Sequence, residues 1–187
     1  MKPFKRSSGV LLPVFSLPSN YGIGTIGKAA YDFIDFLHSA KQAYWQILPV
    51  GSTGFGDSPY QSFSTYAGNP YFIDLDLLIK DGLISKEDVD RFDWGNDPEK
   101  IDYGKIYSAK FAILEMAYKN GIEKDRKKYE KFKEENRSWL GDYSLFMAVK
   151  KHFDFKPRTQ WPEADISRHE KNACDKYREV LKTDVEM

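Results

Sequence analysis

The sequence predicts an α/β fold, in which a strand–helix–strand unit leads into a largely helical segment. Two short, mainly apolar runs, Ser8–Leu12 and Tyr44–Leu48, have the composition of buried strands. The amphipathic helix between them predicts that the two strands are parallel. No third strand follows before Met187, and two parallel strands can neither close a barrel nor form a sizeable sheet. We therefore expect the N-terminal piece of a longer protein.

Composition excludes several classes of function. The 187 residues include 28 Lys and Arg against 28 Asp and Glu, and this zero net charge argues against a nucleic-acid partner. The apolar run near the N-terminus is short and interrupted by Pro13, so we do not interpret it as a signal peptide. No stretch approaches the roughly 20 apolar residues that span a membrane. The single cysteine, Cys174, fits a reducing compartment, and we expect a cytoplasmic protein.

The segment GIGTIG, residues 22–27, matches the GxGxxG pattern of dinucleotide-binding folds. The match is weak because Phe15–Tyr21 separates the glycines from the first strand, and no acidic residue follows the second strand. We interpret these glycines as the start of a helix that Thr25 caps. The residues expected on the inward face of this helix are Ala30, Phe33, Ile34 and Leu37.

The candidate site is the long irregular segment 49–73, which leaves the carboxyl end of the second strand. Loops longer than about 12–15 residues are usually functional or disordered, and disordered segments are poor in aromatic residues, unlike this one. Pro59 and Pro70 predict rigid turns that fix Tyr60 and Gln61. An aromatic ring beside amide, carboxylate and hydroxyl groups suits a sugar. A packed loop whose aromatic residues only fill gaps is the open alternative.

Helices are expected from residue 76 onward. We expect Asp76 to cap a short helix, Leu77–Lys80, and Ser85 to form a capping box with Asp88. Asp74 and Asp76 have the spacing of a metal-binding pair, but no third ligand is near in the sequence, so capping is the preferred interpretation.

Two longer helices are predicted further on. The first covers Ile106–Lys119 and is expected to end at Gly121. The charged stretch Glu123–Arg137 is interpreted as a solvated helix, because its apolar residues are too few for a coiled coil. Asp142 is expected to cap the second helix, Tyr143–His152.

Two long segments resemble a known enzyme family. They are SLPSNYGIGTIGKAAYDFIDFLHSAKQAYWQILPVGSTG (16–54) and GFGDSPYQSFSTYAGNPYFIDLDLL (54–78), joined later in the chain by Trp139 and the pair Trp161-Pro162. They resemble the amylomaltases, the 4-α-glucanotransferases also called disproportionating enzymes. Ser52 stands where Pro is expected and Phe55 where Tyr is common, and neither departure removes a glycine or an aromatic residue from the loop.

The resemblance implies the N-terminal part of a TIM-type (β/α) barrel with a largely helical inserted subdomain. Residues 1–75 would form the first βα units, including the glucan-binding loop 49–73, and residues 76–187 the inserted subdomain, cut off at its C-terminus. By motif position, Tyr60 resembles the aromatic residue that stacks on the donor sugar next to the cleaved bond. Asp57, Ser58 and Gln61 would be supporting contacts, and Phe55 a more remote glucan contact.

The implied activity is the transfer of α-1,4-glucan segments between oligosaccharides, with glucose as an acceptor, by a retaining double displacement. In the family the two catalytic carboxylates lie in later barrel segments. We therefore expect no catalytic residue in this chain and no activity from residues 1–187 without the missing C-terminal part. No cofactor and no metal are implied.

Two alternatives stay open at this point. One is a non-catalytic module that binds α-glucans through the aromatic loop, and the other is a helical interaction protein in which the loop is incidental. Coding sequence that continues beyond Met187 into further βα units would favour the enzyme, whereas a natural stop there would favour the module.

Overall fold

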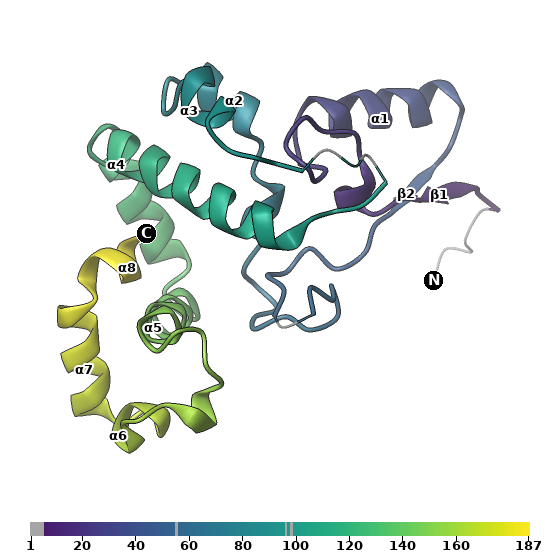
Figure 1. Cartoon of the computed structure of the whole chain (residues 1–187). Coiled ribbons are helices and arrows are strands. Elements are labelled where there is room, and N and C mark those ends of the chain that lie inside the picture. Colours follow the sequence, from purple (N-terminus) through teal and green to yellow (C-terminus); the bar gives the residue numbers. More distant parts are fainter. Residues whose placement is uncertain (1–5, 55, 96, 98) are drawn as a thin grey trace. The chain divides into compact units, whose positions relative to one another are not determined.

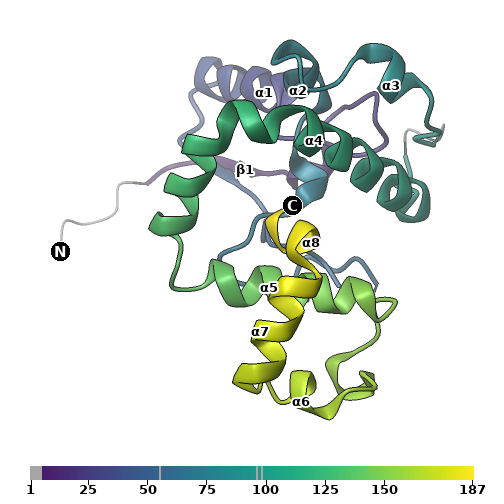
Figure 2. The same ribbon diagram turned by 90° about the vertical axis from the view of Figure 1, so that its left-hand side faces the viewer.

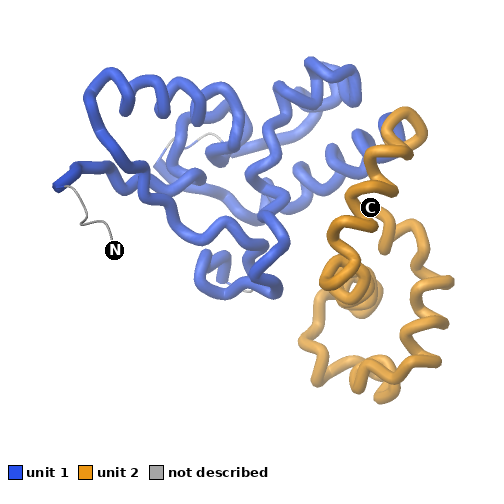
Figure 3. Tube along the Cα trace, turned by 180° about the vertical axis from the view of Figure 1, so that it is seen from behind, with its two compact units in different colours: residues 1–121 blue, residues 122–187 orange. Residues whose placement is uncertain are grey.

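The computed structural model describes residues 6–54, 56–95, 97 and 99–187. The chain forms two compact units, residues 1–121 and residues 122–187, coloured separately in Figure 3. The boundary falls inside one long helix, α4 (Tyr103–Glu135). The two units are described in turn.

Unit 1 begins with the predicted strand–helix–strand arrangement (Figure 1). Strand β1 (Gly9–Leu11) pairs in parallel with β2 (Tyr44–Gln46), and helix α1 (Lys28–Ser39) lies between them in the sequence. Val10 is opposite Trp45 in this register. The parallel pairing confirms the prediction, and both strands are shorter than expected by one or two residues at their ends.

The start of α1 differs from the prediction. The N-cap of α1 is Gly27, and no side chain caps it. Thr25 is buried, and its hydroxyl donates to the carboxylate of Asp74 at 2.5 Å, so its expected capping role was wrong. A Cβ at Gly27 would lie 1.9 Å from the same carboxylate. The last glycine of GIGTIG therefore allows close packing against Asp74, which accounts for the motif without a dinucleotide.

The inward face of α1 is narrower than predicted. Ala30 and Leu37 are buried, and Phe33 packs against the core cluster that contains Ala30, as expected. Ile34 is 48% exposed, so its expected inward position was wrong. Trp45 of β2 packs edge-on against Phe33, at 5.1 Å between ring centroids.

Short helices follow the long loop: η2 (Pro70–Phe72), α2 (Leu75–Lys80) and α3 (Lys86–Asp90). The side chain of Asp74, and not that of Asp76, caps α2 by accepting a hydrogen bond from the Leu77 N–H at 3.0 Å. The expected cap was wrong by two residues, because the helix begins earlier. The carboxylate of Asp76 accepts a hydrogen bond from the Tyr21 hydroxyl instead.

The predicted capping box at the start of α3 is confirmed. The side chain of Ser85 accepts from the Asp88 N–H at 3.1 Å, and the side chain of Asp88 accepts from the Ser85 N–H at 3.0 Å. The hydrogen bond from the Ser85 N–H, together with one from the Ser85 hydroxyl, holds the pKa of Asp88 below its usual value.

The sequence predicted that helix α4 ends at Gly121, and the prediction was wrong. The helix continues to Glu135, and Gly121 lies in mid-helix. A Cβ there would lie 2.6 Å from a methyl carbon of Leu83. A mid-helix glycine costs about 1 kcal/mol relative to alanine, which this close contact offsets. The buried α4 residues in the unit 1 core are Ile106, Ala109, Ile113 and Ala117.

Unit 2 contains the end of α4 and four further helices. They are α5 (Leu140–His152), α6 (Ala164–Ser167), α7 (Lys171–Val180) and α8 (Lys182–Glu186), with α7 and α8 packed across α5 (Figure 2). Their core contains the buried side chains of Leu145, Val149, Trp161, Ile166, Cys174 and Tyr177.

In unit 2, the prediction for the charged half of α4 is confirmed and the prediction for the cap of α5 is wrong. The charged half of α4 is solvated as predicted, with ion pairs along its own surface such as Arg126–Glu123 at 2.7 Å. The N-cap of α5 is Trp139, so the capping role expected for Asp142 was wrong. The carboxylate of Asp142 accepts from Arg178 at 3.1 Å instead and joins α5 to α7. Within the described parts of the chain, no helix combines the length and apolar character needed to cross a bilayer.

Candidate functional site

The loop 49–73 folds back on itself as two hydrogen-bonded arms. Gly51 pairs in antiparallel fashion with Gly68, and Thr53 with Ser62. The N–H of Asn69 donates to the carbonyl of residue 50 at 2.8 Å. Gly51 must lack a side chain here, because a Cβ would lie 2.5 Å from the hydroxyl oxygen of Ser62. These contacts agree with the prediction of an ordered loop.

The tip of the loop, residues 54 and 56–61, is closed by hydrogen bonds of its own. The N–H of Gly54 donates to the carbonyl of Gln61 at 3.1 Å, and the N–H of Gln61 donates to the carbonyl of Ser58 at 3.1 Å. The hydroxyl of Ser58 accepts from the Tyr60 N–H at 3.4 Å. Asp57 adopts a φ of 52°, a left-handed conformation that aspartate tolerates better than most residues. The tip therefore holds Tyr60 through its own backbone.

Two of the predicted site residues point to solvent. The side chain of Tyr60 is 72% exposed, and Gln61 beside it is also exposed. Ser58 is half-buried beneath them. Phe55, expected to make a more remote glucan contact, lies outside the described residues. An exposed ring on a hydrogen-bonded turn can stack on the apolar face of a sugar at little entropic cost.

Asp57 faces the interior of the loop. It lines a small pocket with Pro59, Tyr71 and Tyr103, and the space inside suits about one water molecule. Burial raises the pKa of Asp57 above its usual value. Burial also raises the pKa values of Tyr71 and Tyr103, and the negative charge of Asp57 adds to both shifts. The carboxylate is therefore close to two phenols that link the tip to α4.

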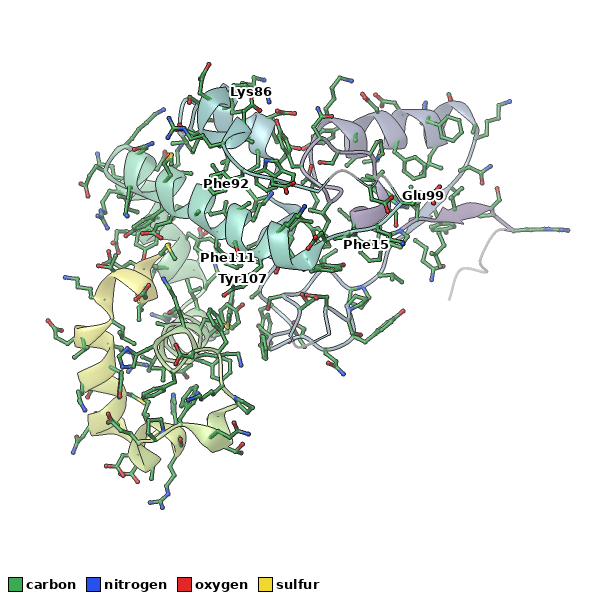
Figure 4. All side chains as sticks on the ribbon, in the orientation of Figure 1. Phe15, Lys86, Phe92, Glu99, Tyr107 and Phe111 are labelled. Atoms are coloured by element: carbon green, nitrogen blue, oxygen red, sulfur yellow. The ribbon has the colours of Figure 1, made fainter. Side chains whose placement is uncertain are left out.

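The base of the loop, residues 69–74, is held by other elements. The side chain of Asn69 accepts from the Tyr71 N–H at 3.0 Å and so begins η2. The buried ring of Tyr71 lies 6.1 Å from Tyr103 and 6.2 Å from Phe111, centroid to centroid. Tyr107 and Phe111 are neighbours on α4, with ring centroids 5.0 Å apart (Figure 4). Aromatic side chains of α4 thus support the loop.

Lys110 contacts this base, and it was not among the site residues predicted from the sequence. Its side chain is fully buried, and its amine donates to the carbonyl of Ile73, where the loop ends. Burial lowers the pKa of Lys110 from 10.5 to about 8, although the nearby carboxylate of Asp74 opposes the shift. A signal was present, since Lys110 stands between Ile106 and Ile113 on the apolar face of the predicted helix.

The carboxylates of the acidic pair Asp74 and Asp76 accept hydrogen bonds from groups within unit 1. Within the described residues, no group of three or more His, Cys, Asp or Glu side chains is arranged to hold a metal ion. Asp74 bonds Thr25 and the backbone of α2, and Asp76 bonds Tyr21. Both carboxylates are therefore accounted for by contacts within unit 1.

Comparison with known proteins identifies the family to which this site belongs. A sequence model described as 4-alpha-glucanotransferase matches residues 12–187. The chain belongs to the 4-alpha-glucanotransferase family. It is 51% identical over 178 residues to the 4-alpha-glucanotransferase of Streptococcus pneumoniae, covering 95% of this chain and 35% of that protein. It is 41% identical over 184 residues to that of Thermus thermophilus, covering 96% of this chain and 36% of the relative.

A solved structure agrees with the family assignment. The chain is similar to a structure described as amylomaltase from Streptococcus agalactiae in complex with acarbose, with a TM-score of 0.93 and 44% sequence identity. The similarity covers 97% of this chain and 37% of the amylomaltase. The chain thus spans about a third of the length of the family members that it matches. The resemblance found in the loop motif is confirmed, and membership of this family does not favour a helical interaction protein.

Proposed function

We propose that this chain is the N-terminal portion of a 4-α-glucanotransferase, in which loop 49–73 binds the donor glucan. The observation that carries the proposal is the exposed ring of Tyr60 on a turn fixed by its own hydrogen bonds, in a chain of this family. The reaction would move an α-1,4-glucan segment to the 4-hydroxyl of an acceptor sugar, such as glucose, with retention of configuration. The solved amylomaltase that carries acarbose supports a sugar ligand.

The roles within the site follow from exposure. Tyr60 would stack on the donor sugar, and Gln61 would bond its hydroxyls, because both side chains face solvent. Ser58 and Asp57 are part-buried and bonded within the loop or lining its pocket, so their contribution would be to hold the tip. Phe55 keeps its proposed role as a more remote contact.

The proposed architecture is the first part of a (β/α) barrel. Apolar side chains in the short sheet and just after it support this, because Leu11 is 55%, Tyr44 58% and Ile47 41% exposed. Strands of a parallel barrel are covered on both faces, so these side chains would pack against further barrel strands and helices. Residues 1–75 would supply the first βα units, and residues 76–187 the inserted subdomain. A cytoplasmic location stays a prediction.

Transfer activity is tested in a longer protein. In this protein, called the chimaeric transferase below, residues 1–187 replace the matching part of the S. pneumoniae relative. Incubation with maltotriose should yield glucose and longer oligosaccharides, and the new linkages should keep the α-configuration in a proton NMR spectrum. A folded chimaeric transferase that binds acarbose and transfers nothing would contradict the proposal and favour a binding module.

A further inference from the structure

The place of Lys110 in the fold is unusual for a lysine. Its side chain is as buried as those of Ile106 and Ile113, which lie one turn before it and one turn after it along α4. Lysine is almost never fully buried unless it is paired. Its amine donates to the main-chain carbonyl of Ile73, the last residue of the loop. Asp74, the next residue, provides the negative charge nearby.

This lysine costs stability in the fold. Removing an ammonium group from water is unfavourable, and burial accordingly lowers the pKa of Lys110 to about 8. At neutral pH the group is still mostly protonated, so the native state carries a desolvated charge. An apolar side chain of similar length would avoid this cost, and buried charges can often be replaced by such residues without loss of stability. Stability alone therefore does not explain a lysine here.

The contacts of this lysine are with the end of the loop. Ile73 and Asp74 join the loop to α2, and the carboxylate of Asp74 also bonds Thr25, just before α1. Lys110 adds α4 to this junction. Three segments that are distant in the sequence, at residues 25, 73–74 and 110, thus meet where the loop ends.

A shift in the position of this junction would also move the tip of the loop. Residue 69 is bonded to residue 50, Gly68 is paired with Gly51, and Ser62 is paired with Thr53, so the two arms move together. Gly54 and Gln61 close the tip on the same arms. The orientation of Tyr60 therefore depends on where the base is held.

We infer that Lys110 is a positioning residue of the glucan-binding loop: its amine fixes the carbonyl of Ile73, and thereby the arms that carry Tyr60. The inference rests on the proposed function of the loop for its kinetic consequence, and on the contacts above for its structural one. Lys110 touches no substrate and takes no part in bond making or breaking.

The test compares Lys110→Met with Lys119→Met in the chimaeric transferase. Both changes remove one ammonium group from α4, but Lys119 is exposed and pairs with Glu115 within the helix. We expect Lys110→Met to lower kcat/KM for maltotriose by at least tenfold while the Tm shifts by less than about 3 °C. Lys119→Met should change neither. Lys110→Gln, which keeps a hydrogen-bond donor without the charge, should recover part of the lost activity.

Hydrogen exchange without substrate provides a readout that does not depend on catalysis. In Lys110→Met, peptides that cover 49–73 should exchange at least tenfold faster, whereas peptides of α1 should be unchanged. Loop exchange and kinetics like those of the wild type would overturn the inference. A Lys110→Met protein that fails to fold would also overturn it, because Lys110 would then hold the whole unit and not the loop.

The two proposals can fail separately. Faster loop exchange with unchanged transfer would sink the proposed function of the loop but not the anchoring by Lys110. A large kinetic loss in Tyr60→Ala, combined with unchanged kinetics and exchange in Lys110→Met, would reject the anchoring and keep the proposed function.

Discussion

The tip and the base of loop 49–73 belong to one segment but are stabilised in different ways. The tip, residues 54 and 56–61, is closed by its own main-chain hydrogen bonds and presents Tyr60 to solvent. The base, residues 69–74, buries Tyr71 and Phe72 and is bonded to Thr25 and Lys110 from other elements. The surface proposed to bind the glucan is thus separate from the contacts that stabilise the loop. Changes to the exposed ring at the tip should alter kinetics, whereas truncation of the packed side chains at the base should lower stability.

The largest expected effect tests whether residues 1–187, which include the tip and the base of the loop, catalyse glucan transfer on their own. Residues 1–187 alone should produce no glucose or longer oligosaccharides from maltotriose, because a retaining transfer needs two catalytic carboxylates about 5–5.5 Å apart and we expect neither in this chain. Products are followed by thin-layer chromatography, with the chimaeric transferase as the positive control. Turnover that scales with the concentration of the 187-residue chain would contradict this prediction.

The second effect is a loss of stability at the base. Tyr71 is 7% exposed and contacts two aromatic residues of α4, so Tyr71→Ala should lower the free energy of unfolding by about 3–5 kcal/mol. The matched control is Tyr66→Ala on the same loop, at a side chain that is 72% exposed, with an expected change below about 0.5 kcal/mol. Urea titration of the chimaeric transferase measures both. Equal losses at the two positions would remove the distinction between base and exposed loop.

The third effect is kinetic and confined to the tip. Stacking of Tyr60 on a sugar face would bury several tens of Å² of apolar surface, which is worth about 1–2 kcal/mol. Tyr60→Ala should therefore lower kcat/KM at least tenfold, with part of the loss in kcat, and leave the Tm unchanged. Tyr60→Phe should keep most of the activity. A lowered Tm with unchanged kinetics would mean that the ring is a packing residue.

The sequence predicted those features that depend on local signals. The parallel strands, the capping box of Ser85 and Asp88, and the solvated half of α4 follow from composition and spacing over a few residues. The exposed position of Tyr60 agrees with its expected role, and the proline-flanked loop is hydrogen-bonded as expected.

Features set by contacts between distant segments could not be read from local patterns. Gly121 has the appearance of a helix stop, but its partner Leu83 lies 38 positions away, and the glycine allows that contact in mid-helix. Thr25 looks like a cap until Asp74 is placed beside it. Lys110 has no sequence signal beyond a charge in an apolar face, and its partner Ile73 is 37 residues away. The tip of the site was therefore more predictable than its base.

The smallest expected effect is a pH dependence of the free energy of unfolding, which arises from Lys110 at the base of the loop. The pKa of Lys110 is lowered from 10.5 to about 8, so between these values the folded state binds fewer protons at this site than the unfolded chain. Raising the pH through this window therefore removes a cost of folding, and stability rises. Asp74, the charged neighbour of the amine, opposes the shift without reversing it.

The measurement compares wild type with Lys110→Met. Because the other titrating groups are common to both proteins, their contributions to the free energy of unfolding cancel. Between pH 7 and 9, the difference in free energy of unfolding should move by about 1 kcal/mol in favour of the wild type. A difference that stays constant over this range would show that the amine of Lys110 is solvated and that the base does not bury a charge.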